Sequence, residues 1–250
     1  MRDWWGDFMI PYAPIDTLKS VAADIWIVDG SIIRFGVGPF RAPFTTRMTV
    51  VRLNDGGLWV HSPIEAGEAL FAAVEALGPV RFLIAPNPIH YWWIPQWKAR
   101  FPEAEFHAVE TLKTRAKRPL PDFHELGSDA PGGWSEIIDQ LLVEDGWFRE
   151  AVFFHKESRT LILADLIENF ELSHVHGRFL RLLLRLGGVL DPDGKMPRDM
   201  RFAFRRHREG LKGAVERMLA WDPERIILAH GRWYDRDGVA ELKRAFRWLL

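Results

Sequence analysis

Short runs typical of β-strands alternate with amphipathic helical segments along this 250-residue chain. Some neighbouring strands are joined by tight loops, such as Asn54–Gly57, whose glycines favour a β-hairpin between residues 48–53 and 58–62. Others are joined by helices. Because hairpins and crossovers both occur, the order favours a layered α/β (α+β) sandwich over a purely parallel barrel. The remaining strands are expected at 25–28, 80–85, 105–109, 138–143, 147–154, 160–164 and 225–229.

The helical and irregular segments complete this expected organisation. Residues 34–44 are rich in glycine and proline and are expected to form a loop, and residues 118–133 form the longest irregular segment. We expect a single domain over residues 1–250, in which a helical segment at 174–221 is inserted before the last strand. The expected helices are 65–77, 95–101, 111–116, 174–186, 197–221 and 237–250.

Composition excludes several classes of function. The chain contains no cysteine, so a metal site must use His, Asp, Glu or backbone oxygens. The 33 basic and 34 acidic residues give a net charge of −1, which provides no global attraction for nucleic acid. We expect no integral membrane association, because no apolar run approaches the length of a membrane span. The N-terminus lacks the basic start and apolar core of a signal peptide, so a cytoplasmic protein is expected.

Three polar residues follow the ends of expected buried strands: His90 after 80–85, Asp165 after 160–164 and His230 after 225–229. Strand ends meet at one edge of a sheet, so these side chains are expected to lie close together. Two imidazoles and a carboxylate are the minimum set for a mononuclear zinc or non-haem iron site. Each residue also has a purely structural interpretation, such as stacking on a neighbouring aromatic ring or capping a turn.

Four segments resemble, in order and approximate spacing, landmarks of the metallo-β-lactamase superfamily. They are the hairpin with Asn54–Gly57, the strand and loop ending in His90, Thr160–Asp165 and Ile226–Gly231. Residues 51–63, 85–90 and 150–155 are more similar to domain-of-unknown-function family 4336, a bacterial family beside these enzymes that has no settled activity. The resemblance implies a four-layer αββα sandwich with one or two metal ions, in which metal-activated water attacks an ester, amide, thioester or phosphodiester.

The chain departs from the superfamily pattern at several ligand positions. If His90 matches the last histidine of the motif His-x-His-x-Asp-His, the other three ligand positions hold Ala85, Asn87 and Ile89, and of these only Asn87 could coordinate a metal weakly. The next histidine ligand has no equivalent, which leaves Glu144, Asp145 or Glu150 as substitutes. Asp165 matches the bridging aspartate and His230 the final histidine. The resemblance therefore implies one metal ion or none rather than a dinuclear zinc site.

The leading hypothesis is a single zinc or iron ion held by His90, Asp165 and His230, in a hydrolase acting on an apolar small molecule. Asp165, Glu150 and Asn87 are the expected catalytic residues. Trp92, Trp93 and Trp97 could wall a pocket for such a substrate, although core packing explains them equally well. Two alternatives stay open: a metal-free binding or assembly protein on the same fold, and an iron-dependent oxidoreductase. The oligomeric state is open as well.

One expected helix has an unusual surface pattern. Arg178, Arg181 and Arg185 follow one face beside five leucines at 180, 182, 183, 184 and 186. Such a helix could lie on a membrane surface or on another protein. The commoner arrangement packs the leucines against the sheet and extends the arginines into solvent.

Overall fold

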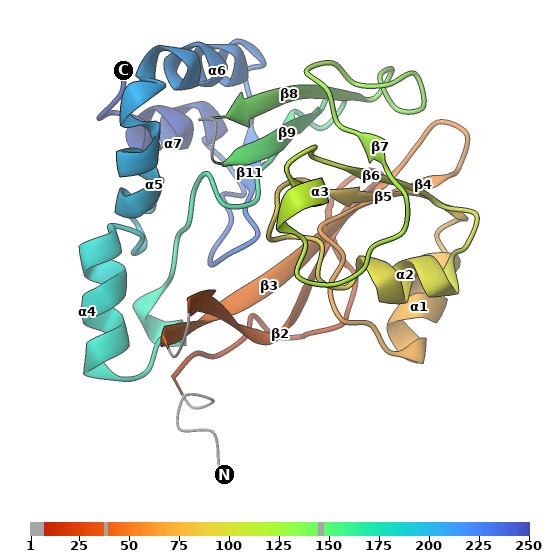
Figure 1. The fold of residues 1–250 in the computed structure, drawn as a ribbon, viewed down its shortest axis with the longest axis horizontal. Coiled ribbons are helices and arrows are strands. Elements are labelled where there is room, and N and C mark those ends of the chain that lie inside the picture. Colours follow the sequence, from red (N-terminus) through yellow and green to blue (C-terminus); the bar gives the residue numbers. More distant parts are fainter. Residues whose placement is uncertain (1–7, 38–39, 145–147) are drawn as a thin grey trace.

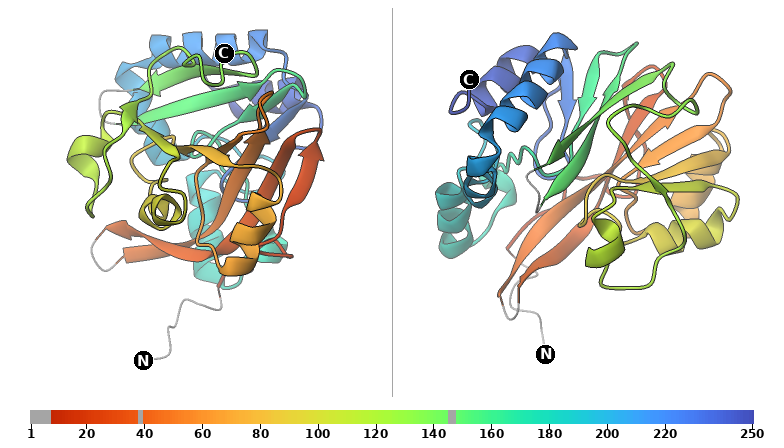
Figure 2. Two further views of the ribbon diagram at one scale, coloured as in Figure 1. Left: turned by 90° about the vertical axis from the view of Figure 1, so that its right-hand side faces the viewer. Right: turned by 45° about the horizontal axis from the view of Figure 1, so that its top comes forward.

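The computed structural model describes residues 8–37, 40–144 and 148–250. Two β-sheets pack face to face, and helices cover the outer face of each sheet (Figures 1 and 2). The right-hand view of Figure 2 shows the resulting order of layers: helices, sheet, sheet, helices. This arrangement confirms the expected four-layer αββα sandwich. None of the described helices has the length and apolar character needed to cross a membrane.

The first sheet contains seven strands, which lie in the order of the chain. The pairings from β1 to β4 are antiparallel and those from β4 to β7 are parallel. Helices α1 (Glu68–Glu75), α2 (Ile94–Arg100) and α3 (Leu112–Arg115) connect the parallel strands. The strands are β1 (Lys19–Ala22), β2 (Ile25–Val37), β3 (Phe40–Arg52), β4 (Leu58–His61), β5 (Val80–Ala85), β6 (Glu105–Ala108) and β7 (His124–Glu125).

The second sheet has four strands in the order β11-β10-β9-β8. Strands β10 and β11 are parallel neighbours, although three helices separate them along the chain. The strands are β8 (Ile138–Glu144), β9 (Arg149–His155), β10 (Thr160–Ile162) and β11 (Arg225–Ile227). The helices are α4 (Arg178–Gly187), α5 (Arg198–Ala203) and α6 (Arg208–Ala220), with α7 (Gly238–Ala245) after β11.

Aromatic side chains hold the two sheets together. Trp59 of β4 and Phe153 of β9 are fully buried and meet edge to face, with 4.9 Å between their ring centres. Trp134 packs edge-on against Trp59 and Phe82 in the same cluster. Burying such rings removes a large apolar area from water, so the aromatic core stabilises the packing of the two sheets and the positions of their strand ends.

Two expectations about local structure are wrong. Residues 34–37 and 40–44 form paired antiparallel strands rather than a loop, with pairs from Ile33–Phe44 to Val37–Phe40. Pro43 is tolerated because the outer edge of this part of β3 pairs with no further strand among the described residues. The expected helix at 197–221 divides into α5, a 3₁₀ turn (Phe204–Arg206) and α6, and the side chain of Phe204 is buried in the core at this break.

Candidate metal centre

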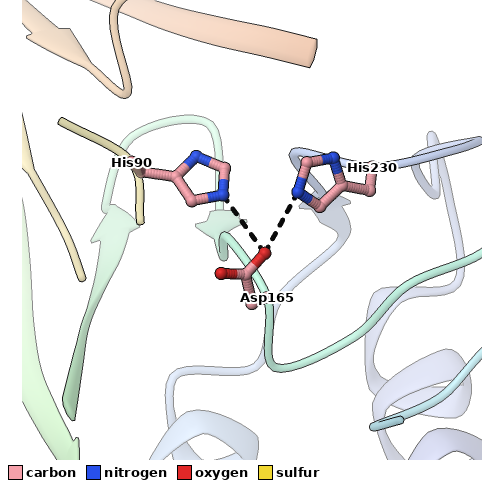
Figure 3. A group of neighbouring side chains, drawn as sticks. All are labelled: His90, Asp165 and His230. Carbon is pink, nitrogen blue, oxygen red and sulfur yellow. Dashed lines mark hydrogen bonds and ion pairs between the residues drawn. The ribbon is translucent and has the colours of Figure 1, made fainter. Parts of the chain in front are cut away.

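His90, Asp165 and His230 come together at the ends of three different strands. His90 follows β5 of the first sheet, whereas Asp165 and His230 follow β10 and β11 of the second. Figure 3 shows both imidazole rings pointing at one carboxylate oxygen. The distance from Asp165 Oδ1 is 3.1 Å to His90 Nε2 and 3.1 Å to His230 Nε2. The three potential ligand atoms lie within 4.8 Å of one another, and the site spans the edge between the two sheets.

The tautomer of His230 shows why a cation fits this site. His230 Nδ1 lies 2.5 Å from the backbone carbonyl oxygen of Thr45, which can only accept a hydrogen bond, so Nδ1 carries the proton. In the neutral ring, Nε2 then presents a lone pair toward Asp165 Oδ1, which is also an acceptor. Two acceptors 3.1 Å apart are stable only with a proton or a metal ion between them. The donor set of two nitrogens and one oxygen suits one zinc or iron ion.

His90 is oriented by a side-chain hydroxyl, which can donate or accept a hydrogen bond. Its Nδ1 lies 2.5 Å from Ser62 Oγ, immediately after β4, so the ring turns Nε2 toward Asp165. Both candidate imidazole ligands therefore have a hydrogen-bond partner on the ring nitrogen that faces away from the site. This arrangement is typical of metal-ligating histidines.

Asn87 holds the other carboxylate oxygen of Asp165. Its amide nitrogen donates to Asp165 Oδ2 at 2.8 Å and to Glu150 Oε2 at 3.1 Å. Its amide oxygen accepts from the backbone N–H groups of Ile89 and His90. Only this orientation of the amide matches donors to acceptors, because the opposite one would face two carboxylates with an oxygen. Asn87 therefore links the loop that carries His90 to the carboxylate of Asp165.

Glu150 lies behind Asp165, fully buried in β9. Its two oxygens accept hydrogen bonds from the backbone N–H groups of Ala164 (2.9 Å) and Asp165 (2.8 Å). Burial and the neighbouring Asp165 raise the pKa of Glu150 to about 7. Burial also acts to raise the pKa of Asp165, but His90 and His230 outweigh it and hold that pKa well below its usual range. Asp165 is thus the carboxylate that carries the negative charge.

The loop after β11 is held by residues of β3 in the opposite sheet. Arg47, which is buried, donates to the carbonyl oxygens of Leu228 (2.6 Å) and Gly231 (2.8 Å). The same guanidinium pairs with Asp29 at 2.6 Å. Gly231 has φ +82°, and a Cβ there would lie 2.1 Å from the carbonyl oxygen of Asn169. The backbone beside His230 therefore requires glycine and is fixed from both sheets.

A cavity of about 950 Å³ opens onto the three residues. Trp92 and Trp93 line it, in agreement with the expected aromatic wall, whereas Trp97 packs in the core and donates its indole N–H to the Ile64 carbonyl (2.7 Å). Neither Asn87 nor Glu150 is among the lining residues. Most of the lining is apolar and includes Ile33, Phe44, Ile64, Ile89, Leu184 and Val189.

Glu168 is a residue of the cavity that the sequence analysis did not single out. It is half-buried and lines the same cavity as Asp165 and His230. Burial raises the pKa of Glu168 to about 8, against the opposing effect of His230 and with smaller contributions from Asp165 and other nearby carboxylates. Its one sequence signal was an acid placed three residues after Asp165, in a segment that also contains leucine and isoleucine.

Of the suggested substitutes for the missing histidine ligand, Glu150 lies behind Asp165, and Glu144 is not at the site. Glu144 is exposed at the end of β8 and pairs with Arg149 at 2.5 Å. Asp145 lies outside the described residues. Ala85 and Ile89 offer only apolar side chains. Within the described residues, the candidate ligand set is therefore limited to the two histidines and Asp165.

Comparisons with known proteins agree with this architecture. Residues 24–112 match the model of a family described as "Domain of unknown function (DUF4336)". Among curated proteins, none matches the chain. A similar solved structure is DIM-1 metallo-β-lactamase exposed to ceftazidime, with TM-score 0.60, 13% identity, and coverage of 93% of this chain and 95% of that chain.

Two further structures show the same likeness. FIM-1 metallo-β-lactamase from Pseudomonas aeruginosa, in its mono-zinc form, has TM-score 0.55 and 10% identity, and covers 94% of this chain and 96% of its own. Rubredoxin oxygen:oxidoreductase from Desulfovibrio gigas has TM-score 0.60 and 10% identity, with 93% of this chain and 61% of that chain covered. The chain therefore has the metallo-β-lactamase fold. At these identities the likeness concerns the fold and not the reaction.

Proposed function

We propose that this protein is a hydrolase of an apolar small molecule and that His90, Asp165 and His230 hold its single metal ion, zinc or iron. The observation that carries the proposal is the convergence of two imidazole nitrogens and one carboxylate oxygen at an apolar cavity. A divalent cation held there would activate a water molecule and polarise the bond to be cleaved.

The surrounding residues act by positioning the three ligands. Ser62 and the Thr45 carbonyl orient the two rings. Asn87 and Glu150 were expected to assist catalysis directly, but their polar atoms are occupied by Asp165 and the nearby backbone. We assign them the task of fixing Asp165, because neither lines the cavity.

Glu168 is the residue best placed to move a proton within the cavity. With a pKa of about 8, its carboxyl group holds a proton at neutral pH. A protonated carboxyl that lines the substrate cavity can donate this proton to a leaving group. Asp165, whose pKa is lowered, stays ionised beside it.

The cavity supports the choice of substrate class. Its volume of about 950 Å³ lies near the upper end of ordinary small-molecule sites. Trp92, Trp93 and Phe44 offer aromatic surface, and the polar lining includes Glu168 together with the three candidate ligands. A substrate with one cleavable polar bond on an otherwise apolar body fits this division.

The test is the metal content of protein purified without an affinity tag or chelator, measured by plasma mass spectrometry. We expect about one zinc or iron per chain, lost in His90→Ala combined with His230→Ala. His207→Ala is the matched control, because His207 is exposed on another part of the surface. Absence of metal from the wild type, even after reconstitution with zinc, iron or manganese, would contradict the proposal and favour the metal-free binding protein.

The identity of the ion separates hydrolysis from redox chemistry. Zinc would direct the assay to esters and amides with apolar substituents. Iron would favour the oxidoreductase alternative, which the ligand set allows and which the likeness to the Desulfovibrio gigas protein makes worth testing. In the iron case, oxygen consumption replaces hydrolysis as the measured activity.

A further inference from the structure

We propose that helices α4 and α5 form a docking surface for a lipid bilayer with anionic headgroups. This α4–α5 face consists of Phe179, Leu182, Leu183, Leu186 and Phe202, together with the arginines around them. These five apolar side chains are between 44% and 65% exposed. Both helices lie along one outer edge of the molecule, where α4 lies beside the ends of β2 and β3 (Figure 1).

Helix α4 divides into three sectors around its axis, at 100° per residue. Leu180 and Leu184 are buried in a cluster with Phe170 and Val175. The four exposed apolar side chains of α4 form the next sector, and its three arginines form the third. The rest of the protein therefore covers only one of the two apolar sectors of α4, and the exposed apolar sector lies next to the three arginines. This is the pattern of a helix that lies in the interface of a membrane.

The charge around this face is strongly positive. Residues 172–208 contain nine Lys and Arg residues and three Asp residues, a local charge of +6 in a chain of net charge −1. Asp193, one of the three acids, is paired with Lys195, Arg244 and Arg247. Among the described residues, no carboxylate forms an ion pair with any arginine at 178, 181, 185, 198, 205 or 206. Arg181 donates to the backbone carbonyls of Val175 and Leu172, and the other five guanidinium groups are available to lipid phosphates.

An anionic bilayer suits this face better than a second copy of the chain. Two such faces in contact would bring their arginines together without compensating carboxylates. The ten residues of α4 are too few to span a bilayer, so the helix would lie flat on it. Phe179, Leu183 and Leu186 also line the cavity, as do the exposed Phe35 and Trp92. Docking would therefore place the mouth of the cavity against the lipid.

The experiment is sedimentation of the full chain with vesicles of phosphatidylcholine alone or mixed with an equal amount of phosphatidylglycerol. We expect binding to the anionic vesicles that weakens as salt is raised. Arg178→Glu combined with Arg185→Glu should lower the partition constant by more than about tenfold. Leu182→Ser combined with Leu186→Ser should also reduce binding, since it removes the apolar contact.

The matched control reverses two exposed cations on other helices, Arg217→Glu on α6 and Lys243→Glu on α7, and should bind as the wild type does. Circular dichroism checks that each variant is folded. If Arg178→Glu with Arg185→Glu does not fold, Arg178→Gln with Arg185→Gln is used in its place. Wild type that stays in the supernatant at low salt would overturn the proposal, as would equal binding by all variants. A wild-type dimer that Leu182→Ser with Leu186→Ser makes monomeric, without vesicle binding, would assign the face to a second copy instead.

Discussion

His61, at the end of β4, allows a quantitative prediction about acid stability. The side chain is 2% exposed and stacks on Trp59, with 5.5 Å between ring centres. Its Nε2 is buried and has no hydrogen-bond partner among the described residues. Burial, together with the nearby His90, lowers the pKa of His61 from 6.5 to about 3. The folded protein therefore holds this ring neutral over a pH range in which the unfolded chain protonates it.

The sign and size of the effect follow from this difference. Between pH 6.5 and about 3, the unfolded state binds one more proton at His61 than the folded state does. The free energy of unfolding consequently falls as the pH is lowered through this window. The full shift corresponds to about 5 kcal/mol, and by pH 5 the loss relative to neutral pH is about 2 kcal/mol.

The variant His61→Phe removes the titrating group and keeps an aromatic ring beside Trp59 and Phe153. We expect urea unfolding at pH 7 and pH 5 to show a pH-dependent loss that is smaller in the variant by about 2 kcal/mol. His207→Phe, at an exposed histidine, is the control and should keep the wild-type loss. An equal loss in His61→Phe and wild type would refute the reasoning, because His61 would then titrate alike in both states.

Two further substitutions test the support of the metal centre. Ser62→Ala removes the partner of His90 Nδ1 and should weaken zinc binding about 10- to 100-fold in a chelator competition, whereas Ser135→Ala should not. Arg47→Met leaves Asp29 without its buried guanidinium and frees two carbonyl groups, so urea unfolding should show a loss of about 3–5 kcal/mol. A loss below about 1 kcal/mol would show that Arg47 is not needed to join the sheets.

The strand pattern and the residues after each strand carried most of the information about the fold. The runs before His90, Asp165 and His230 are short and largely apolar, as buried strands require, and each of these polar residues lines the cavity beyond its strand end. These properties are local, so the sequence predicts them. The hairpin formed by β2 and β3 was missed because its glycines and proline indicate a loop unless the pairing partner is known.

The contacts that organise the site could not be predicted in the same way. Asn87 and Glu150 are 63 residues apart, and Arg47 lies 181 residues from Leu228. Nothing near these residues in the chain indicates such partners, since each contact depends on how the strands are ordered in two separate sheets. The raised pKa of Glu168 likewise arises from burial among side chains brought together only by folding.

The two sheets supply different parts of the candidate metal centre, so its geometry depends on how the sheets are placed relative to each other. Asp165 and His230 follow strands of the second sheet. Thr45, which bonds His230 Nδ1 and the backbone N–H of Gly231, lies in β3 of the first sheet. A small shift between the sheets would move His90, Ser62 and Thr45 together relative to Asp165. The apolar core around Trp59 and Phe153 opposes such a shift, because close-packed rings cannot slide without opening voids. The geometry of the candidate ligands therefore depends on a core that contains none of them.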